Sequence, residues 1–437
     1  LNSMEILRNE HPRPDRVREN WCTLNGQWQF AFDPSNAGRR EKWYRTLPAT
    51  HQIEVPFCYQ SKLSGIDNRE HCDVVWYERS FTVPAGMAAR RLLHFGAVDY
   101  KADVWLDGQY LGGHEGGYTP FTFDVTDLTE AGIEHTLTVR CEDRLDFDQP
   151  RGKQSYRPEA WGCWYTPVTG IWQSVWLEGV GEYYPIDFRL TPCIERGSLK
   201  VEITLNELPA NGSVRLSASM DGKPAARQEI AVTSDRYVQT ELFLRHDETL
   251  EGFRMWRPDD PALYDLRIET LEDGAIADQV DTYFGMRKIE IIRGCVTLNN
   301  SPLYQRLVLD QGYWPDGLLT APSDDALRRD VELTLAMGYN GARKHQKFED
   351  PRYLYWADKL GLLVWGELPS AYWLRDSQKR NMMRDLSEAI KRDYNHPCLI
   401  AWVPINESWG VPFIQTQVEA QELADALVIL GEKETQL

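Results

Sequence analysis

Apolar and polar residues alternate along much of the first 285 positions. Trp28, Phe30 and Phe32 are separated by single residues, which is the spacing of one strand face. The segments 104–106 and 109–111 flank Asp107-Gly108, a typical hairpin turn. Helical periodicity is nearly absent up to residue 180. Many short strands with Gly and Pro turns predict a β-sandwich of the jelly-roll type over residues 1–180.

A second strand pattern covers residues 181–285. Residues 199–205 alternate between apolar and polar, and Asp221-Gly222 and Asp273-Gly274 indicate two more hairpins. A span of about 105 residues with roughly seven strands predicts an immunoglobulin-like β-sandwich. The Cys-Trp-Cys signature of antibody domains is missing, so this likeness concerns architecture only.

After residue 285, strand segments alternate with helical ones. Strands are expected at 304–310, 340–345, 362–368 and 399–405, and helices at 324–337, 352–360, 381–394 and 413–430. Repeated β-α units indicate a parallel sheet, either doubly wound or closed into a barrel. No G-x-G-x-x-G follows the first strand, so a dinucleotide-binding fold has no support. Four units of about 33 residues equal half of an eight-stranded barrel, so we predict the first half of a (β/α)8 TIM barrel over residues 286–437.

Charge and composition narrow the functional classes. The 437 residues include 48 Lys+Arg and 66 Asp+Glu, a net charge of −18. This surplus argues against a general nucleic-acid or anionic-membrane binder, but not against an enzyme acting on neutral polymers. No apolar run of about 20 residues predicts a membrane span. The 16 tryptophans fit sandwich cores for the most part, and flat platforms for sugar rings for a few.

The cysteines and the N-terminus bear on the compartment. Eight cysteines are scattered without a C-x-x-C pair or zinc spacing, and are interpreted as small buried apolar residues in a reducing compartment. The start, Leu1-Asn2-Ser3-Met4, lacks the charged and apolar regions of a signal peptide. We therefore expect a cytoplasmic protein, with Met4 as its natural start.

Candidate chemistry lies at the carboxyl ends of the predicted parallel strands, where such folds place reactive groups. These positions hold Asp310, Arg343 with His345, Glu367, and Asn406-Glu407. Asp310 and Glu367 either hydrogen-bond sugar hydroxyls or bridge to Arg343, because a buried arginine requires a carboxylate partner. His345 alone is more often a structural histidine, and Lys344 should alternate away to the surface. No metal spacing is evident, so we expect neither metal nor cofactor.

Glu407 follows the apolar run 400–405, so we expect it at the edge of an apolar surface from which water is excluded, a dry wall. Such an environment raises the pKa of a carboxyl group, so that it holds a proton at neutral pH. The alternative is an acid that merely begins the next helix. Spacing alone leaves both interpretations open.

Several motifs together resemble glycoside hydrolase family 2, the group of β-galactosidases, β-glucuronidases and β-mannosidases. Leu24-Asn25-Gly26-Gln27-Trp28-Gln29-Phe30 and 169–177 resemble its sugar-binding domain, and 283–287 the end of its immunoglobulin-like domain. Asn395-His396-Pro397 and 402–407 resemble its acid/base signature. The resemblance covers nearly the whole chain.

The resemblance implies a carbohydrate substrate and a retaining mechanism with two glutamates. Glu407 would be the general acid and then base, Asn406 would hydrogen-bond the sugar 2-hydroxyl, and Arg343 matches a family arginine near the nucleophile. Trp409 would be a stacking wall, with core packing as its alternative. His345-Gln346-Lys347 replaces the family's usual His-Tyr-Pro, and the first strand also departs from the usual pattern, so the sugar pocket is atypical.

The resemblance also places the nucleophilic glutamate on the seventh barrel strand, whereas the chain ends after the fourth helix. We therefore expect the chain as given to be inactive. A half-barrel would leave two open sheet edges and an uncovered apolar face, and we expect either a homo-oligomer that buries them or poor solubility. Two functions follow: an exo-acting β-glycosidase of the galactosidase or glucuronidase type, or a non-catalytic carbohydrate-binding or remnant protein.

Overall fold

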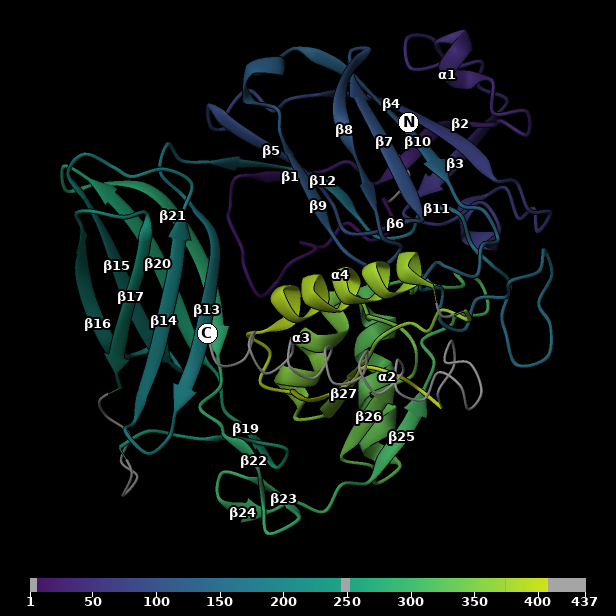
Figure 1. Ribbon diagram of the computed structural model, residues 1–437. Coiled ribbons are helices and arrows are strands. Elements are labelled where there is room, and N and C mark those ends of the chain that lie inside the picture. Colours follow the sequence, from purple (N-terminus) through teal and green to yellow (C-terminus); the bar gives the residue numbers. More distant parts are fainter. Residues whose placement is uncertain (1–5, 245–251, 374, 408–437) are drawn as a thin grey trace.

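The protein is predominantly β and has several domains, as a computed structural model shows for residues 6–244, 252–373 and 375–407. Two sandwiches and a parallel sheet make up these residues (Figure 1). The first sandwich lies above the parallel sheet in Figure 1, and the second lies to the left of both. No helix within the described residues is long and apolar enough to cross a membrane.

The N-terminal sandwich consists of two antiparallel sheets. Its strands are β1 (Trp21–Thr23), β2 (Gly26–Phe32), β3 (His51–Val55), β4 (Val74–Thr82), β5 (Arg90–Phe95), β7 (Lys101–Leu106), β8 (Gln109–Glu115), β9 (Phe121–Asp124), β10 (Glu134–Glu142) and β12 (Val175–Val180). One sheet has the order β3-β2-β4-β10-β7-β8 and the other the order β1-β12-β5-β9. Trp28 and Phe30 are buried in the core between them, which confirms the inward face predicted for β2.

Short elements complete this sandwich: the strand pair β6 (Val98–Asp99) and β11 (Gly170–Ile171), the helix α1 (Gly38–Glu41), and the 3-10 turns η1 (Lys62–Ser64) and η2 (Thr126–Leu128). The hairpin between β7 and β8 turns at Asp107-Gly108 as predicted, and both residues have positive φ. The residues between β10 and β11 form a long loop, which we call the 143–169 loop.

The second sandwich has seven longer strands within the described residues: β13 (Pro185–Cys193), β14 (Ser198–Leu205), β15 (Gly212–Met220), β16 (Lys223–Val232), β17 (Tyr237–Phe243), β20 (Tyr264–Glu272) and β21 (Ala275–Phe284). They form the sheets β13-β14-β17 and β16-β15-β20-β21. The alternation of β15 places Val214, Leu216 and Ala218 in the shared core. The predicted turns at Asp221-Gly222 and Asp273-Gly274 join β15 to β16 and β20 to β21.

Small strands connect this sandwich to the rest of the chain. They are the pair β18 (Trp256–Arg257) and β19 (Asp260–Pro261), and the three-stranded sheet of β22 (Ile289–Ile292), β23 (Cys295–Leu298) and β24 (Ser301–Pro302).

The C-terminal part is a parallel sheet with helices between its strands, as predicted. Its strands, in sheet order, are β25 (Leu307–Asp310), β26 (Gly341–Lys344), β27 (Leu363–Glu367) and β28 (Leu399–Val403). Its helices are α2 (Asp324–Ala336), α3 (Pro351–Leu360) and α4 (Asp376–Asp393). The expected helix 413–430 lies outside the described residues, and the interpretation as half of a barrel stays a prediction.

Local signals explain where these helices begin and end. The Ser323 side chain accepts a hydrogen bond from Ala326 N at 3.1 Å and caps α2. Asp350 caps α3 through Arg352 N at 2.9 Å, and Pro351 occupies the first turn, where its missing N–H costs nothing. Gly361 ends α3 with a φ of 83°, which favours glycine.

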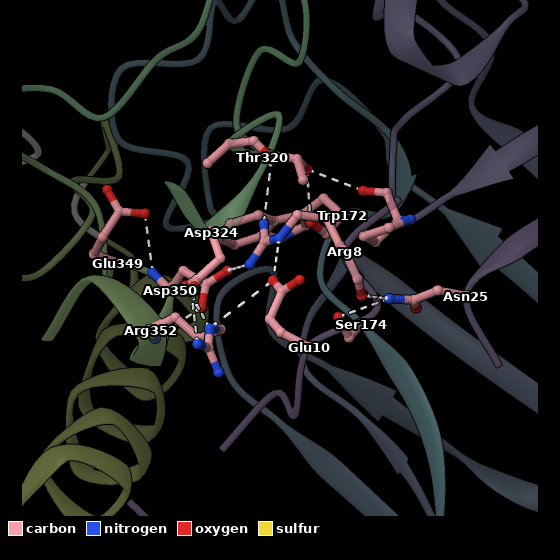
Figure 2. A network of polar contacts seen from close by, with 12 residues as sticks. Arg8, Glu10, Asn25, Trp172, Ser174, Thr320, Asp324, Glu349, Asp350 and Arg352 are labelled. Atoms are coloured by element: carbon pink, nitrogen blue, oxygen red, sulfur yellow. Dashed lines mark hydrogen bonds and ion pairs between the residues drawn. The ribbon is translucent and has the colours of Figure 1, made fainter. Parts of the chain in front are cut away.

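Residues 6–18 join the N-terminal sandwich to the parallel sheet (Figure 2). The buried Arg8 guanidinium lies 2.5 Å from Glu10 Oε1 and 2.8 Å from Asp350 Oδ2. The Arg8 carbonyl accepts from Asn25 Nδ2 at 2.7 Å. Arg352 Nη1 donates to the His11 carbonyl at 2.6 Å. These contacts fix the orientation of the sandwich above the strand ends.

The same segment also reaches the second sandwich. Val17 and Asp281 exchange backbone hydrogen bonds of 2.7 and 2.9 Å. The Arg18 guanidinium lies 3.0 Å from Asp278 Oδ2 and 3.2 Å from Glu178 Oε2, so it bridges both sandwiches. One short stretch of chain therefore contacts all three parts.

The cysteines depart from their predicted burial. All eight are free, and Cys58, Cys141 and Cys398 are buried as expected. Cys163 and Cys295 are exposed, which corrects the prediction for these two. Cys163 lies in the 143–169 loop and Cys295 is the first residue of the short strand β23. Neither position belongs to the core of a sandwich.

Candidate active site

Arg343, Glu367 and Asn406 meet at the carboxyl ends of three adjacent parallel strands. Arg343 Nε donates to Glu367 Oε2 at 2.5 Å, and Arg343 Nη2 donates to Asn406 Oδ1 at 2.7 Å. Glu367 is fully buried and Asn406 is 4% exposed. The charge network predicted around Arg343 is therefore present, and Glu367 is the carboxylate that accompanies it. Whether Glu367 also binds sugar hydroxyls stays a prediction.

His345 joins the same group from the residue after β26. Its side chain points to the same side as Arg343, two positions earlier, and its Nδ1 lies 3.1 Å from Glu367 Oε1. This close contact falls outside hydrogen-bond geometry. Gln346 Nε2 lies 3.4 Å from His345 Nε2. His345 is buried and is held by its neighbours.

Asp310 belongs to a separate network on the outer face of the sheet. Lys344 Nζ lies 2.5 Å from Asp310 Oδ2 and 2.9 Å from Glu349 Oε2. Lys347 Nζ lies 2.9 Å from Glu349 Oε1. Burial alone would raise the pKa of Glu349, but the two lysines lower it to about 2. The structure therefore does not bring Asp310 together with Arg343.

Lys344 corrects the prediction of a surface lysine. Its side chain does alternate away from Arg343, but it is only 2% exposed. In a β/α fold the outer face of a strand packs against helices rather than water, and Lys344 Nζ lies 4.1 Å from the ring centroid of Tyr353 on α3. The alternation along β26 is therefore confirmed, but this pattern does not indicate the helices that cover the outer face.

Asn406 and Glu407 follow β28 directly. Glu407 is exposed and has a φ of 49°, a left-handed conformation that is uncommon outside glycine. Residues 400–405 are half-buried, so the dry wall expected beside Glu407 is not formed by them. Trp402 and Ile405 nevertheless pack against a buried apolar cluster. The pKa expectation for Glu407 stays a prediction, and Trp409 lies outside the described residues.

Asn406 has one polar atom that is not satisfied. Its Oδ1 accepts from Arg343, but its Nδ2 is buried and has no hydrogen-bond partner among the described residues. A buried unpaired donor costs roughly 1–3 kcal/mol, so such groups need an explanation. A ligand oxygen at this position would satisfy it.

Sequence reasoning missed the part of the site that comes from the N-terminal sandwich. Arg151 N and Gly152 N both donate to the Ser370 carbonyl at 3.0 Å, three residues after Glu367. Gly152 has a φ of 62°, and a Cβ there would overlap the Gln346 carbonyl oxygen. The available signal was the three aromatic residues within 161–165, two of which are exposed.

Among the residues that the structure describes, no three His, Cys, Asp or Glu side chains are grouped so that they could hold a metal ion. The arrangement at the strand ends instead offers hydrogen-bond donors and a carboxyl group.

The family models match the two sandwiches. The model described as "Glycosyl hydrolases family 2, sugar binding domain" matches residues 22–177, and "Glycosyl hydrolases family 2" matches residues 185–287. Together these two models cover more than half of the chain, which belongs to glycosyl hydrolase family 2.

Named relatives and solved structures agree with this family. A β-glucuronidase of Paenibacillus borealis is 26% identical over 416 residues, covering 88% of this chain and 67% of that protein. A β-galactosidase of Thermoanaerobacter pseudethanolicus is 28% identical over 400 residues, covering 88% and 50%. The chain thus spans about half to two thirds of these relatives. A β-glucuronidase structure from Ruminococcus gnavus has the same fold, with a TM-score of 0.80 at 21% identity over 100% of this chain and 73% of that one.

Proposed function

We propose that the chain carries the acid/base half of a retaining β-glycosidase site for terminal non-reducing β-glycosides, of the β-galactosidase or β-glucuronidase type. Glu407 is the general acid that protonates the leaving-group oxygen, and then the base that activates water. Asn406 donates from Nδ2 to the sugar 2-hydroxyl, a contact that strengthens in the transition state.

The observation that carries this proposal is the orientation of Asn406. Arg343 holds the amide oxygen at 2.7 Å, which leaves the buried Nδ2 as a donor without a partner among the described residues. Arg343 is in turn fixed by Glu367. A preorganised donor directly before an exposed carboxyl residue is what a glycoside-cleaving site needs. The names of the two relatives support the same class of substrate.

The second carboxylate of a retaining mechanism has no candidate among the described strand ends. It must lie about 5–5.5 Å from the first carboxyl group and have a free oxygen for attack. Glu367 is fully buried, and its two oxygens face Arg343 and His345. Asp310 faces Lys344 on the other side of the sheet. We therefore propose that this chain alone binds β-glycosides without hydrolysing them.

The second candidate is a non-catalytic carbohydrate-binding or remnant protein. It is supported by the same observation, that Glu367 and Asp310 are both paired with side chains of the protein. For the isolated chain, both candidate functions predict that a glycoside is bound and not hydrolysed. They differ in whether Glu407 can act once a nucleophile is supplied.

A panel of nitrophenyl glycosides tests the proposal. It comprises the β-galactoside, β-glucuronide, β-mannoside, β-glucoside and α-arabinopyranoside, with turnover and calorimetric binding measured for each. We expect binding of one sugar without nitrophenol release. Asn406→Ala should weaken that binding about tenfold or more, as loss of a hydrogen bond to a buried donor implies. The exposed Asn211→Ala is the matched control.

Two results would contradict parts of the proposal. Nitrophenol release that disappears in Glu407→Gln would show that a carboxylate of this chain, or of a second copy, acts as the nucleophile. Equal binding by Asn406→Ala and the unchanged protein would remove the role given to Asn406.

A further inference from the structure

The 143–169 loop of the N-terminal sandwich is anchored to the rim of the parallel sheet. Its backbone is bound to Ser370, three residues after Glu367. Further along the loop, Trp164 Nε1 donates to the Tyr372 hydroxyl at 2.5 Å, and the Tyr372 N–H donates to the Phe147 carbonyl at 3.2 Å. The loop therefore forms part of the surface around the candidate active site.

Tyr165 is held at this rim from two sides. Its ring stacks on that of Tyr313, with centroids 4.0 Å apart and an angle of 15° between the planes. Its backbone N–H donates to the Lys153 carbonyl and its carbonyl accepts from Ser155 N, both at 2.8 Å. Burial, followed by the charge of Asp310, raises the pKa of the Tyr165 phenol, which agrees with a position near the end of β25. The ring is thus presented rigidly.

Tyr165 also differs from the other exposed aromatic rings of this rim. Trp161 has Trp164 stacked on it and the Arg157 guanidinium 4.1 Å from its ring centroid. Trp373 likewise has Phe147 stacked on it and the Arg375 guanidinium 4.4 Å from its ring centroid. Tyr165 is 38% exposed, and Tyr313 is the single ring or cation in contact with it among the described residues. Part of Tyr165 is therefore accessible from outside.

Tyr165 lies closer to the protein surface than the polar groups of the candidate site do. Glu367 and Asn406 are buried at the strand ends, whereas Tyr165 lies at the surface above the end of β25. A glycoside whose cleaved sugar contacts the buried polar groups extends its leaving group outward. A flat, accessible aromatic face suits the apolar face of a ring.

We propose that Tyr165 forms a stacking subsite for the leaving group of the glycoside, contributed to the site by the N-terminal sandwich. The ligand chemistry is a ring with an apolar face, either the next pyranose of an oligosaccharide or an aromatic aglycone. This inference rests on the proposed function, because it assigns the cleaved sugar to the Asn406 side. It gives the N-terminal sandwich a direct contact with substrate in addition to a supporting role.

Calorimetric binding to the full chain tests the subsite, in the Glu407→Gln background so that all ligands stay intact. The probes are the methyl and phenyl β-galactosides with lactose, and the methyl and phenyl β-glucuronides. The variants are Tyr165→Leu, which keeps apolar bulk without a flat ring, and Tyr165→Phe, which keeps the ring. Tyr110→Ala, at an exposed tyrosine of β8, is the matched control.

We expect the phenyl glycoside of the preferred sugar to bind about tenfold more tightly than the methyl glycoside, a gain of about 1.4 kcal/mol. Tyr165→Leu should remove this difference and leave the methyl glycoside unaffected. Tyr165→Phe and Tyr110→Ala should both retain it. Loss of lactose affinity in Tyr165→Leu would identify a sugar as the second ring, and loss of phenyl affinity alone would identify an aromatic aglycone.

A phenyl glycoside that binds equally to Tyr165→Leu and the unchanged protein would overturn the subsite. If the methyl glycoside still bound through Asn406 in that case, the proposed function would stand. Absence of binding by every glycoside would overturn both together.

Discussion

At the scale of single residues, the candidate site depends on one cation that orients two neighbours. Arg343 contacts Glu367 and Asn406 through different nitrogens of the same guanidinium. A planar fork of donors fixes both partners at once, which a lysine cannot do. In the ion pair of Arg343 with Glu367, the carboxylate is fully buried. Removal of the Arg343 guanidinium would therefore leave the negative charge of Glu367 without a partner and away from water.

Arg343→Met is therefore expected to destabilise the protein by roughly 3–5 kcal/mol, because Glu367 becomes a buried charge without its partner. Urea unfolding followed by circular dichroism measures the change. The double variant Arg343→Met with Glu367→Gln should recover part of the loss, since it removes the charge. Arg329→Met, at an exposed position of α2, serves as the control. A single variant as stable as this control would contradict the assigned role.

At the scale of elements, the sequence predicts the strands and helices of the C-terminal part well. The predicted helix 352–360 is observed as Pro351–Leu360, and the predicted strand 362–368 as Leu363–Glu367. Caps and apolar spacing are local signals, which explains this success. The burial of Lys344 and the stacking of Tyr165 on Tyr313 depend on segments distant in sequence, so no local pattern indicates them.

The 143–169 loop gives a prediction about an element. Gly152→Ala would place a Cβ against the Gln346 carbonyl, a backbone atom that cannot rotate away, at a φ of 62°. We expect a faster hydrogen exchange throughout the loop and weaker binding at the rim. Gly132→Ala is matched to it, because Gly132 also has a positive φ, of 83°, but open space around its Cβ position. Equal exchange rates in the two variants would show that the packing of Gly152 is unimportant.

Helix α4 gives a second prediction. Asp385 is buried against the N-terminal sandwich, and its Oδ1 accepts from Arg384 Nε at 2.9 Å. Burial raises its pKa to about 7, although Arg384 opposes the shift. Because the folded-state pKa lies above the unfolded value of about 3.9, stability is highest below that value and declines as the pH rises to about 7.

Asp385→Asn should flatten this decline, which amounts to as much as ~4 kcal/mol at about 1.4 kcal/mol per pKa unit. Thermal unfolding between pH 4 and pH 8 measures it. Asp376→Asn, at the exposed start of the same helix, should keep the dependence of the unchanged protein. A pH profile that Asp385→Asn leaves unaltered would refute the assignment.

At the scale of the whole molecule, apolar residues are exposed in the edge strand β25, before it, and at the end of α2. Leu309 of the edge strand β25 is 54% exposed, and Tyr304 and Met337 are 78% and 65% exposed. Leu309 is in register with Arg343, so it belongs to the face that carries the candidate site. An exposed parallel edge with apolar residues favours association.

We therefore expect the isolated chain to form dimers or larger species, as light scattering at several protein concentrations would show. Leu309→Lys should shift the population toward monomer, because a charge on the edge opposes pairing. The exposed Leu208→Lys on the second sandwich is the control. A monodisperse monomer of the unchanged chain would contradict this expectation.

The segment 6–18 has a consequence for the order of assembly during synthesis. Its partners Asp350 and Arg352 are made more than three hundred residues after Arg8. A ribosome adding about 5–20 residues per second therefore leaves Arg8 and His11 without these two partners for roughly 17 seconds or more. Both sandwiches can fold in that interval, and Val17 and Arg18 can already bind Asp281 and Asp278. Only the docking of Arg8 and His11 onto the start of α3 then becomes a late step.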